Sequence, residues 1–268
     1  MRTILITGAS TGLGKAAAIL FQSKGWKVIA TMRNVEKGKE LALLPNVEVL
    51  PLDVTNLQQI ENIAQQVIEQ GGVDVVLNNA GYGLAGPAES FTDEQIVEQL
   101  NTNLLGVIRV TRAFIPYFRA KKDGLFIAVT SLAGLIPVPV NSIYNTAKTG
   151  VEAFYETLAF ELGDFNVRTK TVSPGVIKSA FGDNVQIGLM EEYMPAFERG
   201  MRAMAFDTFA STSEEIADIV YEAATDGKDQ LNYVAGLDAQ RHYEQRLGFG
   251  RQGYVDYLRD FNPEQQGE

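Results

Sequence analysis

Short runs of apolar, often β-branched residues alternate along the chain with longer segments of helical pattern. Three of these runs (3–7, 74–79 and 125–130) are nearly continuously apolar, which is typical of strands buried on both faces. Helical patterns fill the gaps, and crossover segments of this length connect parallel strands. The sequence therefore predicts an α/β fold with a doubly wound, seven-stranded parallel sheet and helices on both faces. The predicted strands are 3–7, 27–31, 47–52, 74–79, 125–130, 167–172 and 232–236.

Two segments break this alternation. Residues 181–210 form an irregular, apolar and aromatic insertion, and residues 238–268 predict a helical C-terminal extension rich in Tyr and Arg. Because neither repeats nor a linker interrupt the pattern, we expect one domain over residues 1–268. Within the insertion, apolar side chains recur at steps of four and three and predict one stripe on a helix: Met190, Met194, Phe197, Met201 and Met204.

Composition narrows the classes of function. The chain has 23 basic and 33 acidic residues, a formal charge of −10, which argues against nucleic acid or a membrane surface as partner. It has no cysteine and a single histidine, His242, so we expect no metal site and assign His242 a surface or packing role. No apolar run is long enough for a signal peptide or a spanning helix, and the protein is predicted to be cytoplasmic.

Three glycines follow the first predicted strand. In "LITGASTGLGKAAAILF", Gly8, Gly12 and Gly14 lie between a buried strand and an alanine-rich helix. That turn of a doubly wound sheet is where a nucleotide diphosphate meets backbone N–H groups at a helix N-terminus. The pattern is not a P-loop, since Ala16 follows Lys15 where Ser or Thr is required. We interpret the turn as a cofactor-binding loop, with a ligand-free glycine turn as the alternative.

Two tyrosine–lysine pairs have a four-residue spacing, Tyr144 with Lys148 and Tyr117 with Lys121. On a helix this spacing places both side chains on one face. A neighbouring cation lowers the pKa of a phenol, and a tyrosine tuned in this way can act as a general acid or base. The spacing alone does not distinguish the two pairs.

Four motifs in register resolve this ambiguity. "TGASTGLG" (7–14), "NNAG" (78–81), Ser131 and "YNTAK" (144–148) together resemble the short-chain dehydrogenase/reductase family, in its shorter-chain branch. The stretch "NAGYGLAGPAES" (79–90) is similar to that of hydroxysteroid dehydrogenases. The resemblance implies a Rossmann-like fold and catalysis by Tyr144 and Lys148. Tyr117 and Lys121 precede the fifth strand, at the opposite edge of the sheet, and are expected to be a packing and a solvated residue.

The resemblance also implies roles for the site residues. Tyr144 would donate the proton to a carbonyl oxygen, Lys148 would lower its pKa and hold the nicotinamide ribose, and Ser131 would bind the substrate oxygen. Asn103 would hold a water in a proton relay, with a local backbone-bonding role as the alternative. The residues expected to hold the cofactor are Gly8, Ser10, Gly12, Leu13, Gly14, Arg33, Asp53, Val54, Asn79, Ala80, Gly81, Tyr144, Lys148, Pro174, Gly175, Ile177 and Ser179.

The second predicted strand ends with Met32 and Arg33. NAD-selective proteins have an acid at this point, whereas a guanidinium binds a 2′-phosphate, so NADP(H) is favoured over NAD(H). A methyltransferase on a related sheet would also need an acid at the end of this strand, so Met32 argues against that class of enzyme. A second alternative, an NADP(H)-binding redox sensor without turnover, stays open, although such proteins commonly lose the Tyr or Lys that is present here.

The segments expected around the substrate are apolar. Residues 181–210 follow the nicotinamide-binding segment, where the family places its substrate lid, and 81–87 and 134–142 add apolar or small walls. We therefore expect a small hydrophobic ketone or secondary alcohol as substrate. Family members commonly pair through two long helices, here 93–120 and 142–163, which predicts a homodimer or homotetramer.

Overall fold

The computed structural model describes residues 1–178, 185–204 and 210–261, and its centre is a seven-stranded sheet. The strand order is β11-β7-β6-β4-β1-β2-β3 and every pairing is parallel, so the predicted sheet is confirmed. The strands are β1 Thr3–Thr7, β2 Lys27–Met32, β3 Val47–Pro51, β4 Val75–Asn78, β6 Gly124–Val129, β7 Val167–Pro174 and β11 Asn232–Ala235.

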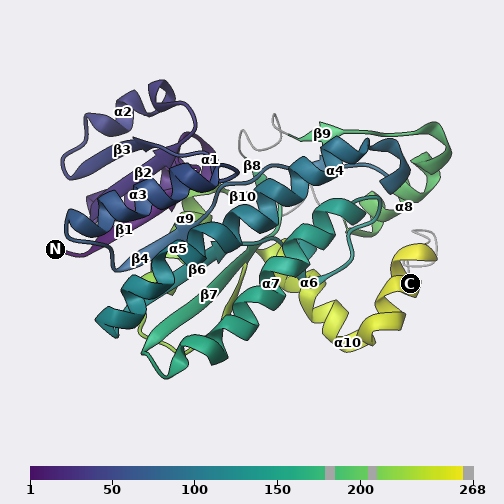
Figure 1. Ribbon diagram of the computed structural model, residues 1–268. Coiled ribbons are helices and arrows are strands. Elements are labelled where there is room, and N and C mark those ends of the chain that lie inside the picture. Colours follow the sequence, from purple (N-terminus) through teal and green to yellow (C-terminus); the bar gives the residue numbers. More distant parts are fainter. Residues whose placement is uncertain (179–184, 205–209, 262–268) are drawn as a thin grey trace.

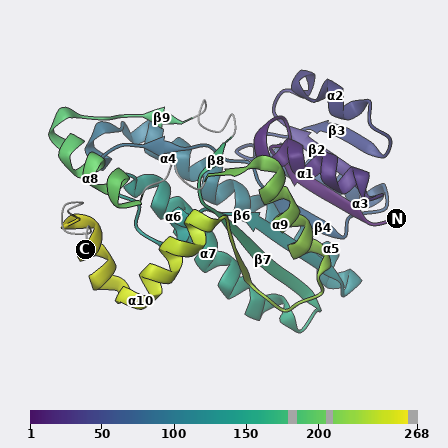
Figure 2. The ribbon, with the colours of Figure 1, turned by 180° about the vertical axis from the view of Figure 1, so that it is seen from behind.

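Helices cover both faces of this sheet (Figures 1 and 2). Alanine-rich α1 (Gly12–Ser23) and α9 (Ser213–Thr225) pack on one face in a core that includes Phe21 and Val220. On the other face α3 (Leu57–Glu69), α5 (Gly106–Lys121) and α7 (Ser142–Gly163) pack around Phe114 and Phe126. The strands are apolar on both sides because both faces are covered, which explains their continuous apolar runs.

The strand order reverses beside β1, which pairs with β2 on one side and with β4 on the other. In open parallel sheets, ligands bind beyond the carboxyl ends of the strands at such a switch point. Thr7 ends β1 and Asn78 ends β4, so the glycine turn and the "NNAG" segment meet at this edge.

The predicted helix over 93–121 is continuous but not uniformly α-helical. It comprises α4 (Asp93–Leu100), a π-helical segment (Asn101–Leu105) and α5. Thr92 and Gln95 form a reciprocal capping box at its start, which fixes where the helix begins. A π-helical turn within an α-helix is rare and frequently marks a functional site.

Smaller elements surround the carboxyl edge. They are α2 (Lys39–Ala42), α6 (Leu132–Leu135), and two pairs of short strands, β5 (Leu84–Ala85) with β9 (Gln186–Ile187) and β8 (Ile177–Lys178) with β10 (Ser211–Thr212). Of the insertion expected at residues 181–210, the structure describes 185–204 and 210. This part contains the helix α8, Met194–Met204.

The C-terminal part forms α10 (Leu237–Arg259), which is kinked at Gly250 and lies beside α8 (Figure 1). His242 on α10 is 1% exposed and its Nε2 lies 2.8 Å from the carbonyl oxygen of Met204. His242 therefore has a packing role at this contact rather than a surface role. None of the described helices is long and apolar enough to cross a membrane.

Candidate functional site

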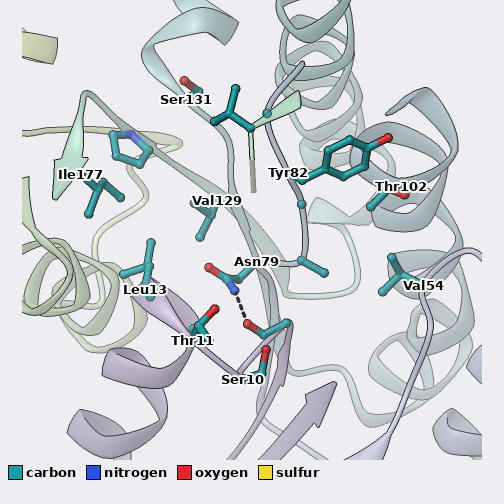
Figure 3. A pocket seen from close by; sticks show the side chains of 18 of the residues that line it. Ser10, Thr11, Leu13, Val54, Asn79, Tyr82, Thr102, Val129, Ser131 and Ile177 are labelled. Carbon is teal, nitrogen blue, oxygen red and sulfur yellow. Dashed lines mark hydrogen bonds between the residues drawn. The ribbon is translucent and has the colours of Figure 1, made fainter. Parts of the chain in front are cut away.

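A cavity of about 750 Å³ opens at the carboxyl edge of the sheet, among the loops that follow β1, β2, β3, β4, β6 and β7. Figure 3 looks into it, with Ser10 and Ser131 toward opposite ends of the view and Asn79 between them. The structure brings most of the predicted site residues to this one cavity: Gly8, Ser10, Gly12, Leu13, Gly14, Arg33, Asp53, Val54, Asn79, Ala80, Gly81, Ser131, Tyr144, Lys148, Pro174, Gly175 and Ile177.

The glycine turn is shaped for close approach of a ligand to its backbone. Gly8 and Gly12 have φ of +70° and +54°, which disfavour other residues. A Cβ at Gly14 would lie 2.4 Å from the carbonyl oxygen of Gly8. Asn79 Nδ2 donates to the carbonyl oxygens of Thr7 (2.9 Å) and Gly8 (3.1 Å) and fixes the turn to the loop after β4. A turn with glycines at the points of closest approach, at a helix N-terminus, fits a dinucleotide diphosphate.

Basic side chains gather where β2 ends. Met32 is buried against Gly38, while Arg33 and Lys37 are exposed and line the cavity. Asn34 Oδ1 accepts a hydrogen bond from the Glu36 backbone N–H (3.0 Å) and caps the short turn that carries Lys37. Sequence reasoning missed Lys37, although the spacing in "RNVEK" could have indicated a second cation beside Arg33.

Asp53 follows β3 and lines the same cavity. Its Oδ1 accepts hydrogen bonds from the backbone N–H (2.9 Å) and the hydroxyl (2.7 Å) of Thr55. These bonds hold the carboxylate in a fixed orientation, and its second oxygen makes no hydrogen bond within the described residues. The adjacent Val54 packs against Gly106 at the start of α5.

Ser131, Tyr144 and Lys148 meet where β6 and α7 converge. Ser131 is the N-cap of α6, and its Oγ accepts a hydrogen bond from the Ala133 N–H at 3.1 Å. Tyr144 and Lys148 are 8% and 5% exposed, and Lys148 Nζ lies 5.7 Å from the centre of the Tyr144 ring. Lys148 Nζ also donates to the Val129 carbonyl oxygen at 3.0 Å, which anchors it below the ring.

Burial dominates the electrostatics of this pair. It raises the pKa of Tyr144 to about 12, with the Ser131 hydroxyl acting in the opposite direction. It lowers the pKa of Lys148 to about 8, against the carboxylate of Glu152, which raises it. The pKa of Tyr144 is thus raised in this structure, because removal of the phenol from water favours its neutral form, and a lowering of this pKa by Lys148 stays a prediction.

Asn103 is not one of the described residues that line the cavity. It is fully buried in the π-helical segment, where its Oδ1 accepts from the Tyr82 N–H (3.1 Å) and its Nδ2 donates to the Tyr82 carbonyl (2.7 Å). Both amide groups thus clamp the loop after "NNAG", rather than bonding within their own helix. Ser179, the remaining predicted cofactor residue, lies outside the described residues.

Two other tyrosines do not line the cavity. Tyr117 and Lys121 lie at the far end of α5, where Lys121 pairs with Asp74 at 2.7 Å, so the lysine is salt-bridged rather than simply solvated. Tyr155 lies on α7 with Tyr144 but is fully buried in the core, where its hydroxyl accepts a hydrogen bond from Asn78 Nδ2 at 2.9 Å. Among these tyrosines, the structure places only Tyr144 beside Ser131 in the cavity.

A second cavity, of about 210 Å³, adjoins the first at Ser131 and Tyr144. Phe197 and Met201 of α8 form one wall, and Val138, between α6 and α7, contributes to another. The predicted stripe therefore divides: these two side chains face the cavity, while Met204 is buried in the core beneath α10. The apolar walls fit the hydrocarbon part of a ligand.

Comparison with known proteins agrees with this geometry. A family model described as short chain dehydrogenase matches residues 2–188. The chain is 36% identical over 204 residues to 3-ketodihydrosphingosine reductase of Bacteroides thetaiotaomicron, covering 74% of each chain. It is 31% identical over 251 residues to human 17-beta-hydroxysteroid dehydrogenase type 1, covering 86% of this chain and 76% of the relative.

Among solved structures, an alcohol dehydrogenase from Thermococcus sibiricus complexed with 5-hydroxy-NADP superposes with a TM-score of 0.73 and 26% identity, covering 88% of this chain and 96% of that one. The family model spans well over half of the chain, and its match includes the glycine turn and the Ser131–Tyr144–Lys148 group. The predicted resemblance is thereby confirmed, and the chain belongs to the short-chain dehydrogenase family of oxidoreductases.

Proposed function

We propose that the protein transfers hydride between NADP(H) and a hydrophobic ketone or secondary alcohol, with Tyr144 as general acid and base. One observation carries this proposal: a single cavity joins the glycine turn after β1 to Ser131, Tyr144 and Lys148. A bound nicotinamide would supply or accept the hydride at that end of the cavity. Nucleotide and reacting groups then share one site, as hydride transfer requires.

Tyr144, Ser131 and Lys148 have separate roles in proton transfer. With its pKa raised to about 12, Tyr144 keeps its proton at neutral pH and is ready to donate it to a carbonyl oxygen during reduction. Ser131 donates a hydrogen bond to the same oxygen and stabilises the charge that develops there. Lys148, held by Val129, binds the ribose hydroxyls and supports the return of a proton to Tyr144.

The preference for NADP(H) rests on the end of β2. Arg33 and Lys37 line the cavity where an NAD-selective site has a carboxylate, and Met32, which is buried, adds no charge to the lining. Two cations attract a 2′-phosphate, and the guanidinium can bind it bidentately.

The preference for an apolar substrate rests on the smaller cavity, with Phe197, Met201 and Val138 in its walls. The names of two relatives, a 3-ketodihydrosphingosine reductase and a hydroxysteroid dehydrogenase, support the same class. Asn103 serves this reaction by fixing the loop that carries Tyr82, and a water-relay role for it stays a prediction.

The test is NADPH consumption with a panel of apolar and polar ketones, with NADH as the cofactor control. Tyr144→Phe should abolish turnover and leave NADPH affinity nearly unchanged, because the phenol hydroxyl acts on the substrate. Tyr155→Phe, on the same helix but buried in the core, is the matched control and should keep its activity. Full activity in Tyr144→Phe would refute the assignment. NADPH binding without turnover of any ketone would favour the redox-sensor alternative.

We also propose a homodimer or homotetramer built on α4, α5 and α7. Val97 on α4, Leu105 in the π-helical segment between α4 and α5, and Phe160 on α7 are 55%, 40% and 87% exposed, and an interface would remove them from water. Light scattering that gives a monomer at micromolar concentration would contradict this assembly.

A further inference from the structure

The smaller cavity contains one polar side chain that the proposed reaction does not use. Among the described residues that line it, the side chains able to form hydrogen bonds are those of Ser131, Tyr144 and Asn141. Ser131 and Tyr144 act on the substrate oxygen in the proposed function. Asn141 lines both cavities and so lies where substrate and cofactor spaces meet.

The side-chain amide of Asn141 does not stabilise the local structure through a hydrogen bond. Asn141 is the N-cap of α7, yet its side chain makes no capping hydrogen bond. Asparagine is among the best N-caps because its oxygen accepts a bond from the first turn. Asn56 shows the usual behaviour at α3, where its Oδ1 accepts from the Gln59 N–H at 3.1 Å. Within the described chain, no hydrogen bond engages the Asn141 amide, which keeps a donor and an acceptor for a ligand.

The backbone before Asn141 is strained. Val140 has φ of +55°, an unfavourable conformation for a β-branched residue, and it also lines the smaller cavity. Its carbonyl oxygen accepts a hydrogen bond from the Gly86 N–H at 3.0 Å, which holds this conformation against the loop after β5. Strained residues of this kind persist where the surroundings enforce them, and they cluster at ligand sites.

Asn141, the N-cap of α7, stands three residues before Tyr144, and both line the smaller cavity. A substrate whose carbonyl oxygen meets Tyr144 and Ser131 would bring its nearest carbon atoms beside the Asn141 amide. We propose that Asn141 is a specificity-determining residue that binds a hydroxyl or amino group on the first or second carbon from the substrate carbonyl. The substrate class becomes an apolar ketone with a hydrogen-bonding group close to its carbonyl, an inference that rests on the proposed function.

The test compares decan-2-one with 1-hydroxydecan-2-one in NADPH-dependent reduction. Their kcat/KM ratio is measured in the wild type and in Asn141→Leu, which removes the amide but keeps its size. Loss of one neutral hydrogen bond should reduce the preference for the hydroxyketone about fivefold. Because the intrinsic reactivity of each ketone is the same in both proteins, only the change in the ratio counts. Asn141→Ser, which keeps a hydrogen-bonding group at this position, should retain part of the preference.

Thermal melting separates recognition from a structural role. Asn141→Leu should melt as the wild type does, since no capping bond is lost, whereas the matched control Asn56→Leu should melt lower with an unchanged ketone ratio. An unchanged ratio in Asn141→Leu would overturn the inference and leave the proposed reductase intact. The inference would also be overturned if Asn141→Leu lowered the melting temperature as the control does and left the kcat/KM ratio of the two ketones unchanged. If the wild type reduced no ketone at all, the proposed function itself would fail, and this inference with it.

Discussion

The cations beside β2 give the sharpest test of cofactor choice. We predict that Arg33→Ala and Lys37→Ala each weaken NADPH binding and leave NADH binding unchanged, because the two cofactors differ only in the 2′-phosphate. Hydrogen bonds to charged groups contribute about 1.5–3 kcal/mol, and exposed ion pairs about 0.2–1 kcal/mol. Both side chains are exposed at the cavity edge. We therefore expect about 1–2 kcal/mol for each, or about 5- to 30-fold in Kd.

The assay is a fluorescence titration of both cofactors at low and high salt. The effect should shrink at high salt, since exposed charges are screened beyond about 10 Å at 0.1 M ionic strength. The control is Arg251→Ala, which makes the same change in net charge on the exposed surface of α10, away from the cavity. This control separates direct contact with the 2′-phosphate from the effect of net charge on cofactor binding, since the chain has a formal charge of −10.

Arg33→Ala and Lys37→Ala combined should weaken NADPH binding by less than the product of the single effects if both cations bind one phosphate, since neighbours in one network are not additive. Equal losses for NADPH and NADH would refute the reasoning, because the cations would then act on a part that both cofactors share. Tighter binding of NADH by the wild type would overturn the NADP(H) preference altogether.

Three further outcomes are expected. Gly14→Ala should weaken cofactor binding at least about tenfold and cost about 1–3 kcal/mol in melting experiments, because its Cβ would lie 2.4 Å from a carbonyl oxygen of the turn. Lys170→Met should destabilise the fold by about 1.5–3 kcal/mol in urea titrations, because Asp226 loses its charged partner at 2.9 Å and keeps Lys228 at 3.6 Å. Burial raises the pKa of Asp226, but hydrogen bonds from a tyrosine hydroxyl and Lys170 outweigh this and lower it. The contribution of the pair is thus present above about pH 4 and lost below it, so the difference from the wild type should narrow in acid. The kcat/KM profile for reduction should fall near pH 8 as Lys148 loses its charge, and Glu152→Gln should move that limb to lower pH; an unmoved limb would contradict the assignment.

The sheet and the glycine turn could be predicted from the sequence because their signals are local. Strands buried on both faces leave continuous apolar runs, and the close approach at Gly14 excludes any Cβ, so both are visible in short segments. The direction of the Tyr144 pKa could not be predicted in this way. It depends on burial by α6, β6 and the loops around them, which no spacing between Tyr144 and Lys148 encodes.

The same distinction explains what sequence reasoning missed around the site. Asn103 in the π-helical segment is buried with its amide bonded to Tyr82, a residue in a different loop. In the sequence, Asn141 looks like an ordinary N-cap residue, as Asn56 does. The structure distinguishes the two, because Asn141 makes no capping hydrogen bond and lines two cavities. Such features arise from tertiary contacts rather than from local pattern.

One stripe of α7 and its N-cap connect these observations. Tyr144, Lys148 and Glu152 follow one another at steps of four and lie on a single face of the helix, and Asn141 precedes them as the N-cap. Asn141 and Tyr144 line the substrate cavity, Lys148 lies deeper, and the Glu152 carboxylate is buried among hydroxyl groups behind β6 and β7. A Cβ at Gly134 of α6 would lie 3.1 Å from both the Glu152 side chain and the Lys148 carbonyl oxygen. This close contact fixes how α7 is rotated, and a rotation would move all four groups together. Recognition, proton transfer and the charge of the lysine are therefore set by the packing of one helix face.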